Sequence, residues 1–318
     1  MSARGSHSCA RSTAPRAARA LVVFPGALGD LILLVPALAA LRAAGQRIEL
    51  SVRRVLADLA RAILPGPQGP AADGAAIASL FGAAVAPALA AWLRGAARVD
   101  AWLGPDDTVR RHARALGVDD VRSHRVERGD GDVHATIAYA RALGVEPAPM
   151  PRVGAHWLAG AAAPSRPRAL VLHPGAGSRA KRWTAEGFRA VADAWHERGG
   201  ETVVLLGPAE ENDVGWWRAT GHEIAAHLDL RDAAALIASA PWYIGNDSGM
   251  SHQAGLLARR GAVLFGPTRA ARWRPLGGSL AALHWPGVAE TDLVARIVTT
   301  LTGCGDGRVP SSPRRRSS

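Results

Sequence analysis

The sequence predicts an α/β protein with two parallel sheets, one in each half of the chain, facing each other across a cleft. Short apolar runs alternate with helical segments, as in the βαβ units that build parallel sheets. The 318 residues are enough for two domains of ordinary size. Polar, glycine-containing motifs follow the apolar runs, and ligands of open α/β sheets bind at the carboxyl ends of strands.

Composition divides the chain into five parts. Residues 1–18 are mainly Ser, Arg and Ala without periodicity, and residues 304–318 end in a basic run, so both are expected to be disordered tails. The segment 161–168 is rich in Pro and Arg and is interpreted as a linker. It separates an N-terminal parallel-sheet domain at 19–160 from a C-terminal one at 169–303.

The N-terminal half opens with an apolar run that resembles a signal anchor, because Arg16 and Arg19 precede residues 21–41. However, Asp30 lies at the centre of that run, and a charge in mid-bilayer is costly. We therefore expect a buried strand at 21–24, a loop and a helix at about 31–43. A second strand is expected at 48–52, whereas 53–150 looks mainly helical and its strands cannot be placed.

The C-terminal half has a more regular pattern of strands and helices. A helix is expected to begin near Thr184, which is a plausible N-cap with Glu186 in the first turn. One further helix is expected to begin at about 209, one to end at about 240 and one to run through 250–258. Strands are expected at 169–172, 202–207, 242–245 and 262–266.

Charged residues and cysteines restrict the function. The formal net charge is +11, with several arginines in the tails, and the only lysine is Lys181. Codon bias explains an excess of arginine, so the single lysine marks a position that requires an ammonium group. A basic chain is compatible with phosphorylated substrates, nucleic acid or an anionic membrane. Cys9 and Cys304 are too isolated to indicate a disulfide framework or a metal site, so a reducing cytoplasm is expected.

The first motif is GALGD at 26–30, between a strand and a helix. Gly26 and Gly29 permit a tight turn and close approach to a ligand. Asp30 is then placed at the start of the helix, facing the cleft. Two interpretations remain open at this point, a functional carboxylate and a helix N-cap. A dinucleotide fingerprint is excluded because GxGxxG is missing.

The second motif is HPGAGSRAKRW at 173–183. A glycine-rich loop that includes Gly177 and Ser178 presents backbone N–H groups to phosphate oxygens, and Lys181 adds positive charge nearby. The alternative is an ordinary βα turn with a solvated lysine. The Walker A pattern is absent, so the loop is not that of a P-loop NTPase.

The third motif is GNDSGMSHQAGLLA at 245–258. Asp247 and Ser248 precede a helix whose exposed amides form an anion site, and Gly249 permits close approach. His252 lies one turn further on the same helix face as Ser248. A capped helix with a half-buried histidine is the alternative. A serine hydrolase is excluded because no GxSxG surrounds Ser248.

Two further loops follow strands. In LLGPAEEND, Gly207 ends a strand, and Glu210 either hydrogen-bonds ribose hydroxyls or simply favours the helix dipole. The segment LFGPT at 264–268 is expected to wall a nucleotide pocket. The tryptophans are interpreted as packing residues: Trp183, Trp273 and Trp285.

Together, in this order, the motifs resemble glycosyltransferase family 9, the ADP-heptose:lipopolysaccharide heptosyltransferases. The resemblance runs from 21 to about 277 and is strongest over 169–277, whereas 53–150 matches little. It implies a GT-B fold of two Rossmann-like domains, with the acceptor on the N-terminal domain, the donor nucleotide on the C-terminal one and no metal or cofactor. It further implies that Asp30 is the general base.

The resemblance also implies roles for the C-terminal motifs. Lys181 would contact the phosphates, Glu210 with Gly207 would lie near the ribose, and the diphosphate and sugar would lie near Gly177, Ser178 and the DSG–H segment, which is Asp247, Ser248, Gly249 and His252. Two positions depart from the family pattern without removing this chemistry. Ser248 stands where threonine is usual, and Thr184 replaces the usual proline.

The implied reaction is inverting transfer of heptose from an ADP-linked donor to a lipopolysaccharide-core or other envelope glycan. Alternatives are a GT-B sugar-nucleotide epimerase, a non-catalytic nucleotide-sugar-binding protein, and a dehydrogenase, which the missing GxGxxG argues against. A cytoplasmic protein is expected, with weak attraction of the basic tail to the inner membrane face as a finer expectation. No nucleic-acid partner is expected.

Overall fold

The computed structural model describes residues 18–125, 133–151, 155–158, 161 and 163–303. Cys9, Cys304 and the predicted C-terminal tail lie outside the described residues, as does all but residue 18 of the N-terminal tail. The same holds for residue 162 of the expected linker.

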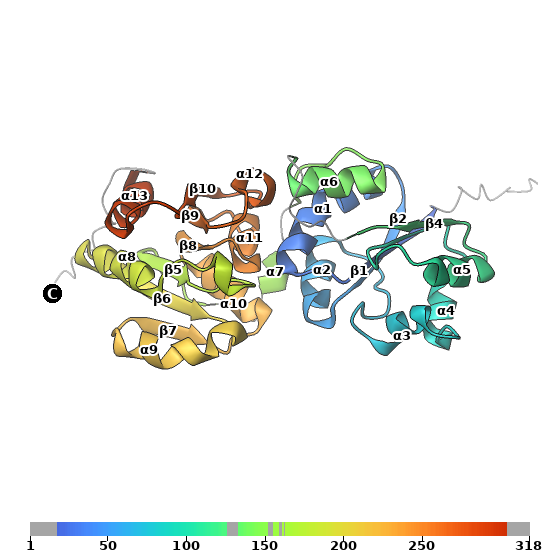
Figure 1. The fold of residues 1–318 in the computed structure, drawn as a ribbon, viewed down its shortest axis with the longest axis horizontal. Coiled ribbons are helices and arrows are strands. Elements are labelled where there is room, and N and C mark those ends of the chain that lie inside the picture. The colour runs from blue at the N-terminus through green and yellow to red at the C-terminus, as the bar shows by residue number, and fades with distance from the viewer. Residues whose placement is uncertain (1–17, 126–132, 152–154, 159–160, 162, 304–318) are drawn as a thin grey trace, which may run out of the picture.

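The N-terminal half forms a four-stranded parallel sheet in the order β2-β1-β3-β4 (Figure 1). Its strands are β1 (Arg19–Phe24), β2 (Arg47–Val52), β3 (Arg98–Ala101) and β4 (Asp120–Ser123). Its helical segments are α1 (Leu28–Ala43), η1 (Arg54–Leu56), α2 (Ala57–Ile63), α3 (Ala75–Ala78), η2 (Ser79–Phe81), α4 (Pro87–Leu93), α5 (Asp107–Ala115) and α6 (Ala135–Leu143).

The strands expected at 21–24 and 48–52 are confirmed as β1 and β2. Sequence patterns did not locate β3, because this four-residue strand places Arg98 and Asp100 in the core. Arg98 binds the Asp100 carboxylate through two nitrogens, and His124 contacts the same carboxylate at 2.8 Å. A buried charge is tolerated when it is paired and hydrogen-bonded, so these polar residues lie inside a strand without apolar periodicity.

The C-terminal half forms a six-stranded parallel sheet in the order β10-β9-β8-β5-β6-β7. Its strands are β5 (Ala169–His173), β6 (Glu201–Leu206), β7 (Glu223–Ala226), β8 (Trp242–Asn246), β9 (Arg260–Phe265) and β10 (Ser279–His284). Its helical segments are η3 (Arg179–Lys181), α8 (Ala185–Glu197), η4 (Pro208–Asp213), α9 (Val214–Ala219), α10 (Leu230–Ser239), α11 (Gly249–Leu256), α12 (Ala270–Trp273) and α13 (Glu290–Gly303).

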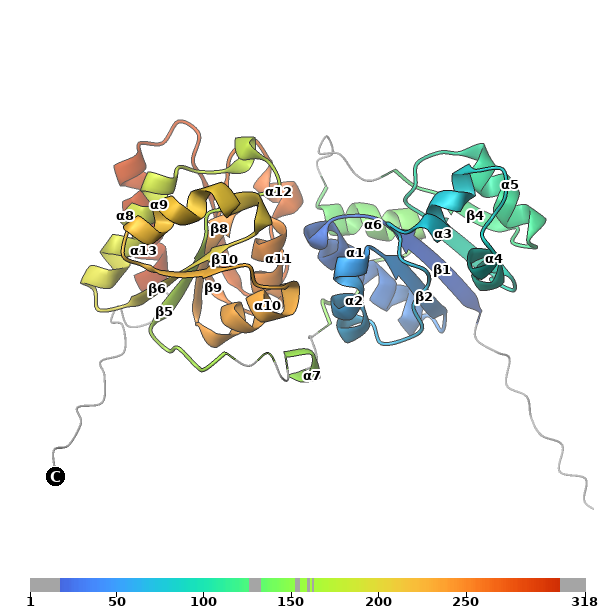
Figure 2. The same ribbon diagram turned by 90° about the horizontal axis from the view of Figure 1, so that it is seen from below.

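Every strand expected in this half is present. Thr184 is the N-cap of α8, as predicted, and its hydroxyl accepts a hydrogen bond from the Gly187 amide at 3.0 Å. The short helix α7 (Ala155–Leu158) lies between the two halves (Figure 2).

Helix α1 joins the two halves. Its buried residues surround the helix rather than forming one stripe, which is typical of a helix covered on all sides. One side packs on the sheet of its own domain, where Leu34 and Leu38 contact the same apolar cluster as Val22. On another side, Ile32 joins a second cluster that includes Leu256 of α11. Figures 1 and 2 show α1 and α11 facing each other between the two sheets.

The apolar run that resembled a signal anchor therefore folds as β1, a loop and α1, as predicted. Within the part of the chain that the structure describes, no helix is long and apolar enough to cross a membrane.

Candidate functional site

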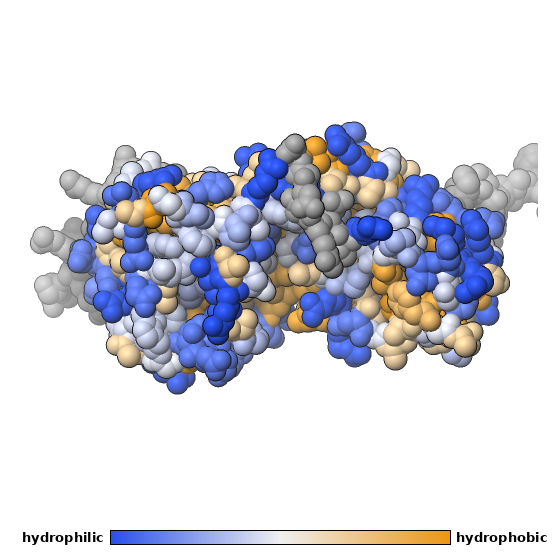
Figure 3. Space-filling view, in the orientation of Figure 1, coloured by the Kyte–Doolittle hydropathy of each residue, from blue (hydrophilic) through white to orange (hydrophobic). Residues whose placement is uncertain are grey.

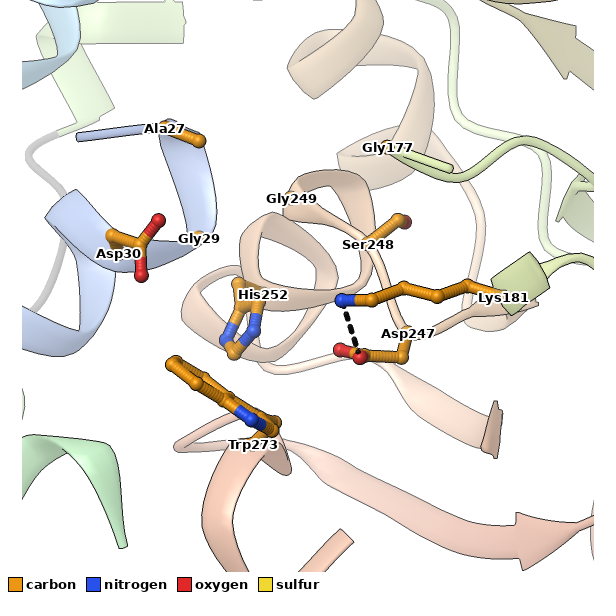
Figure 4. Close-up of a pocket in the computed structure, with 10 residues that line it drawn as sticks. All are labelled: Ala27, Gly29, Asp30, Gly177, Lys181, Asp247, Ser248, Gly249, His252 and Trp273. Atoms are coloured by element: carbon orange, nitrogen blue, oxygen red, sulfur yellow. Dashed lines mark hydrogen bonds and ion pairs between the residues drawn. The ribbon is translucent and has the colours of Figure 1, made fainter. Parts of the chain in front are cut away.

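A pocket of about 290 Å³ lies between the two domains, where the first turns of α1 and α11 meet (Figure 4). The N-terminal domain lines it from the first turn of α1, and the C-terminal domain from the loop after β5, η3 and the start of α11. Eight of its ten lining residues are predicted site residues, and the other two are Ala27 and Trp273. The predicted eight are Gly29, Asp30, Gly177, Lys181, Asp247, Ser248, Gly249 and His252.

Asp30 lies in the first turn of α1 and faces this pocket (Figure 4). It is not the N-cap, because that position belongs to Ala27, whose side chain makes no capping bond. The Tyr139 hydroxyl donates a hydrogen bond to Oδ1 of Asp30 at 2.9 Å. Burial raises the pKa of Asp30 above its ordinary value, although hydrogen bonds from Tyr139 and the Ala27 backbone oppose this shift. A carboxyl group with a raised pKa is suited to accept a proton near neutral pH.

The glycine-rich loop after β5 is fixed to the end of β8 by Asn246. Its side-chain amide donates to the Pro174 carbonyl at 2.8 Å, and its side-chain oxygen accepts from the Trp183 amide at 3.0 Å. Asn246 is fully buried, so one side chain holds both ends of the loop. This arrangement places Lys181, in the turn η3, beside the pocket.

Lys181 points into the pocket and pairs with Asp247 (Figure 4). Its amino group donates to Oδ2 of Asp247 at 2.9 Å, and the Thr268 hydroxyl donates to the same oxygen at 2.7 Å. Asp247 is almost buried, with 5 % of its side chain exposed, whereas 33 % of the Lys181 side chain is exposed. The ammonium group therefore has access to the pocket while the carboxylate beneath it holds it in place.

Helix α11 begins at this pocket. Ser248 is its N-cap, with backbone torsions in the extended region, and Gly249 is its first residue. The first amides of a helix have no acceptor within the helix and carry partial positive charge, so an anion is stabilised there. Lys181 and the start of α11 thus line the same cavity as the Asp30 carboxylate.

His252 lies on α11 between Asp30 and Lys181 (Figure 4). Burial lowers its pKa to about 4, so the ring is neutral at pH 7. A Cβ atom on Gly29 would lie 2.7 Å from Cδ2 of His252, and one on Gly249 would lie 2.9 Å from Cβ of Leu28. The two helix starts therefore approach each other closely, and the absence of side chains at these two glycines permits it.

Four predicted site residues lie outside the set that lines this pocket: Gly26, Ser178, Gly207 and Glu210. Gly26 directly precedes Ala27, and Ser178 is exposed just before η3. Glu210 is buried. Its Oε2 accepts from the Gly207 amide at 3.1 Å, and its Oε1 pairs with Arg182 at 2.8 Å. The Glu210 carboxylate thus braces the start of η4 beside the glycine-rich loop, and its proposed contact with ribose remains a prediction.

Several residues at the site were not predicted from the sequence. Trp273 lines the pocket, although it was expected only to pack, and the notable supporting residues are Tyr139, Asn246 and Thr268. Asn246 and Thr268 lie inside recognised motifs, so the carboxyl ends of β8 and β9 were a usable signal. Tyr139 lies in the stretch 53–150, which carries no recognisable motif.

Among the described residues, no group of three or more His, Cys, Asp or Glu side chains is placed to hold a metal ion.

The two parallel-sheet domains and the pocket between them define a GT-B fold, and solved structures share it. A glycosyltransferase family 9 structure from Veillonella parvula superposes with a TM-score of 0.68 at 21 % identity, covering 84 % of this chain and 86 % of that one. The Escherichia coli heptosyltransferase WaaC, solved with ADP, gives a TM-score of 0.67 at 19 % identity, covering 89 % and 98 %.

Comparison of the sequence identifies the family of this chain. The model of glycosyltransferase family 9 (heptosyltransferase) matches residues 109–291, more than half of the chain. The chain therefore belongs to glycosyltransferase family 9. A curated relative, lipopolysaccharide heptosyltransferase 3 of Escherichia coli, is 31 % identical over 125 residues, which is 37 % of this chain. That alignment spans 36 % of the relative, about a third of its length.

Proposed function

We propose that the protein transfers heptose, with inversion and without a metal ion, from an ADP-linked donor to a hydroxyl of a lipopolysaccharide-core or other envelope glycan. The observation that carries this proposal is the composition of one pocket. A carboxylate from the N-terminal domain, Asp30, shares it with an ammonium group and a helix N-terminus from the C-terminal domain, at Lys181 and Ser248. Family membership and the ADP in the WaaC structure support the choice of sugar and nucleotide.

The chemistry follows from these positions. Asp30 accepts the proton of the acceptor hydroxyl while that oxygen bonds to the anomeric carbon of the donor. The bond from this carbon to the nucleoside diphosphate breaks on the opposite face, so the anomeric configuration inverts. Negative charge grows on the departing diphosphate, where Lys181 and the first amides of α11 stabilise it. Closure of the two domains around the donor would exclude water, which otherwise hydrolyses it.

The acceptor domain also offers a surface that fits a lipid-linked acceptor. Residues 74–93 contain no charged side chain, and Phe81 within this stretch is 48 % exposed. Figure 3 shows an apolar area over α3 and α4, which belong to the stretch. Arg94 ends it and is exposed. An apolar surface beside a cationic side chain suits an anionic bilayer, so we propose that this face rests on the membrane that carries the acceptor.

The proposed reaction is tested by nucleotide release. The protein is mixed with ADP- and UDP-sugars, with and without a truncated lipopolysaccharide acceptor, and the freed nucleotide is measured. We expect release from ADP-heptose that depends on the acceptor and falls by about 100-fold or more in Asp30→Asn. Conversion of the donor to its epimer without release of nucleotide would favour an epimerase. ADP binding without release from any donor would favour a non-catalytic binding protein, and normal turnover of Asp30→Asn would exclude Asp30 as the base.

The membrane contact has a separate test. Sedimentation with vesicles of phosphatidylglycerol should carry the wild-type chain down and leave more of the Phe81→Asp variant in solution. Trp216→Asp is the matched control, because Trp216 is an exposed aromatic residue of the other domain, 38 % exposed on α9. Equal binding of wild type and Phe81→Asp would show that this face does not contact lipid.

A further inference from the structure

Tyr139 is placed to control the carboxylate of Asp30. It is fully buried in the middle of α6, and its hydroxyl donates to Oδ1 of Asp30 at 2.9 Å. A hydrogen bond to an ionised carboxylate is stronger than one between neutral groups and restricts the rotation of the carboxylate. With Oδ1 held in this way, Asp30 has Oδ2 available to take a proton in the pocket that it lines.

The tyrosine ring itself is held by two aromatic neighbours. Phe24, at the end of β1, contacts it edge-on with ring centroids 5.7 Å apart, and Trp102, just after β3, does so at 6.2 Å. Both neighbours are buried. Such edge-to-face packing fixes the plane of the ring, so the hydroxyl stays directed at Asp30.

The C-terminal domain holds the helix that carries Tyr139. His134 is the N-cap of α6, and its Nδ1 accepts from the Thr136 amide at 3.3 Å. Its Nε2 therefore carries the proton and donates to the Arg274 carbonyl at 2.9 Å. Beside it, Arg272 donates to the Val133 carbonyl at 3.0 Å. Helix α6 thus extends from a contact between the domains to the carboxylate in the pocket.

We propose that Tyr139 is the positioning residue for Asp30 and sets the orientation of its carboxylate through a helix seated on the C-terminal domain. This inference rests on the proposed function, because it assigns a task to Tyr139 only if Asp30 takes the proton. Tyr139 itself does not touch the reacting atoms in this scheme.

The direction of the pH effect follows from all groups that face Asp30. Burial raises the pKa of Asp30, and the hydrogen bond from Tyr139 is the largest opposing influence, followed by the Ala27 amide and the charge of Lys181. Asp247, across the pocket, raises this pKa, and the neutral His252 ring adds no charge at pH 7. Removing the Tyr139 hydroxyl therefore raises the pKa of Asp30 further.

The test is Tyr139→Phe, which keeps the ring and removes one oxygen. We expect kcat to fall by roughly tenfold or more, since a hydrogen bond to a charged group is lost. The acid limb of the kcat/KM profile should move to higher pH, while affinity for ADP, measured by calorimetry, stays within twofold. A purely structural role would lower the melting temperature without moving the acid limb, and that result would overturn the proposal.

Two comparisons sharpen the experiment. Tyr243→Phe removes the hydroxyl of the only other tyrosine, which is equally buried but bonds Ser251 in the other domain, and it should leave the acid limb in place. In an Asp30→Asn background, Tyr139→Phe should cause no further loss of turnover. If Asp30→Asn is inactive but Tyr139→Phe behaves as wild type, the positioning role is wrong and the proposed function stands. If Asp30→Asn is fully active, the proposed function itself fails.

Discussion

Lys181 and Asp247 form an ion pair at 2.9 Å on one wall of the interdomain pocket. The same carboxylate oxygen accepts a hydrogen bond from Thr268, so Asp247 is held from two sides and in turn holds the lysine. A carboxylate repels a diphosphate when it acts alone. We therefore expect Asp247 to assist donor binding through Lys181 and not by direct contact.

Replacing Lys181 by Met should weaken ADP binding by roughly 10- to 100-fold, because a charge-assisted hydrogen bond is lost and a buried carboxylate is left unpaired. Lys181→Arg should also weaken it, since a planar fork replaces a compact ammonium group. Isothermal calorimetry with ADP measures both. Arg189→Met, on the exposed face of α8, is the matched control. In the Lys181→Met background, Asp247→Asn should partly restore affinity; a further loss would contradict the assigned role of Asp247.

Gly29→Ala should disturb the contact between the domains. The new Cβ atom would lie 2.7 Å from Cδ2 of His252, so the ring or the helix starts must shift, at a cost of about 1–3 kcal/mol. We expect a lower melting temperature and weaker turnover, with the melting temperature partly restored by adding His252→Ala. Gly177→Ala is the control in the same pocket, because its Cβ would meet nothing within 4 Å. Equal stability of the two variants would contradict this account.

Asp30→Asn should stabilise the fold at neutral pH although it removes turnover. Burial raises the pKa of Asp30 in the folded state, so the folded protein favours the protonated form. The contribution of Asp30 to stability is therefore present below its ordinary pKa of 3.8 and lost as the pH rises through the raised value. Denaturant unfolding at pH 8 and pH 5 should show a gain for Asp30→Asn that shrinks at the lower pH. Asp58→Asn, an exposed carboxylate on α2, provides the comparison.

The fold should lose stability in mild acid because two buried histidines are neutral. Burial lowers the pKa of both His173 and His252 to about 4, from an ordinary 6.5. Their contribution is complete above pH 6.5 and is lost as the pH falls toward 4, at about 1.4 kcal/mol per pH unit for each proton that unfolding takes up. Between pH 7.5 and 4.5, the free energy of unfolding should fall less steeply in His252→Gln than in the wild type. In His196→Gln, where the histidine is exposed, it should keep the wild-type slope. An unchanged slope in His252→Gln would mean that folding does not lower the pKa of His252.

The agreement between sequence and structure is closest in the C-terminal half. The runs at 169–172, 242–245 and 262–266 each became a buried strand, because continuous apolar runs suit a parallel sheet that is covered on both faces. In the N-terminal half, β3 was missed since its Arg98 and Asp100 neutralise each other in the core. The two residues pair within the strand, but the groups that complete their hydrogen bonds, His124 after β4 and the Leu143 carbonyl, come from distant segments and cannot be inferred from local periodicity.

The order of short-range motifs was enough to predict two parallel sheets, their loops and a pocket lined by Asp30, Lys181 and the start of α11, because strand ends and helix starts are local features. Only the tertiary structure decided which groups support them. Tyr139 reaches Asp30 from 109 positions away. Asn246, at the end of β8, holds the glycine-rich loop after β5, and Thr268, in the loop after β9, holds Asp247. Hydrogen bonds between distant segments form only when packing brings those segments together, so no spacing along the chain records them.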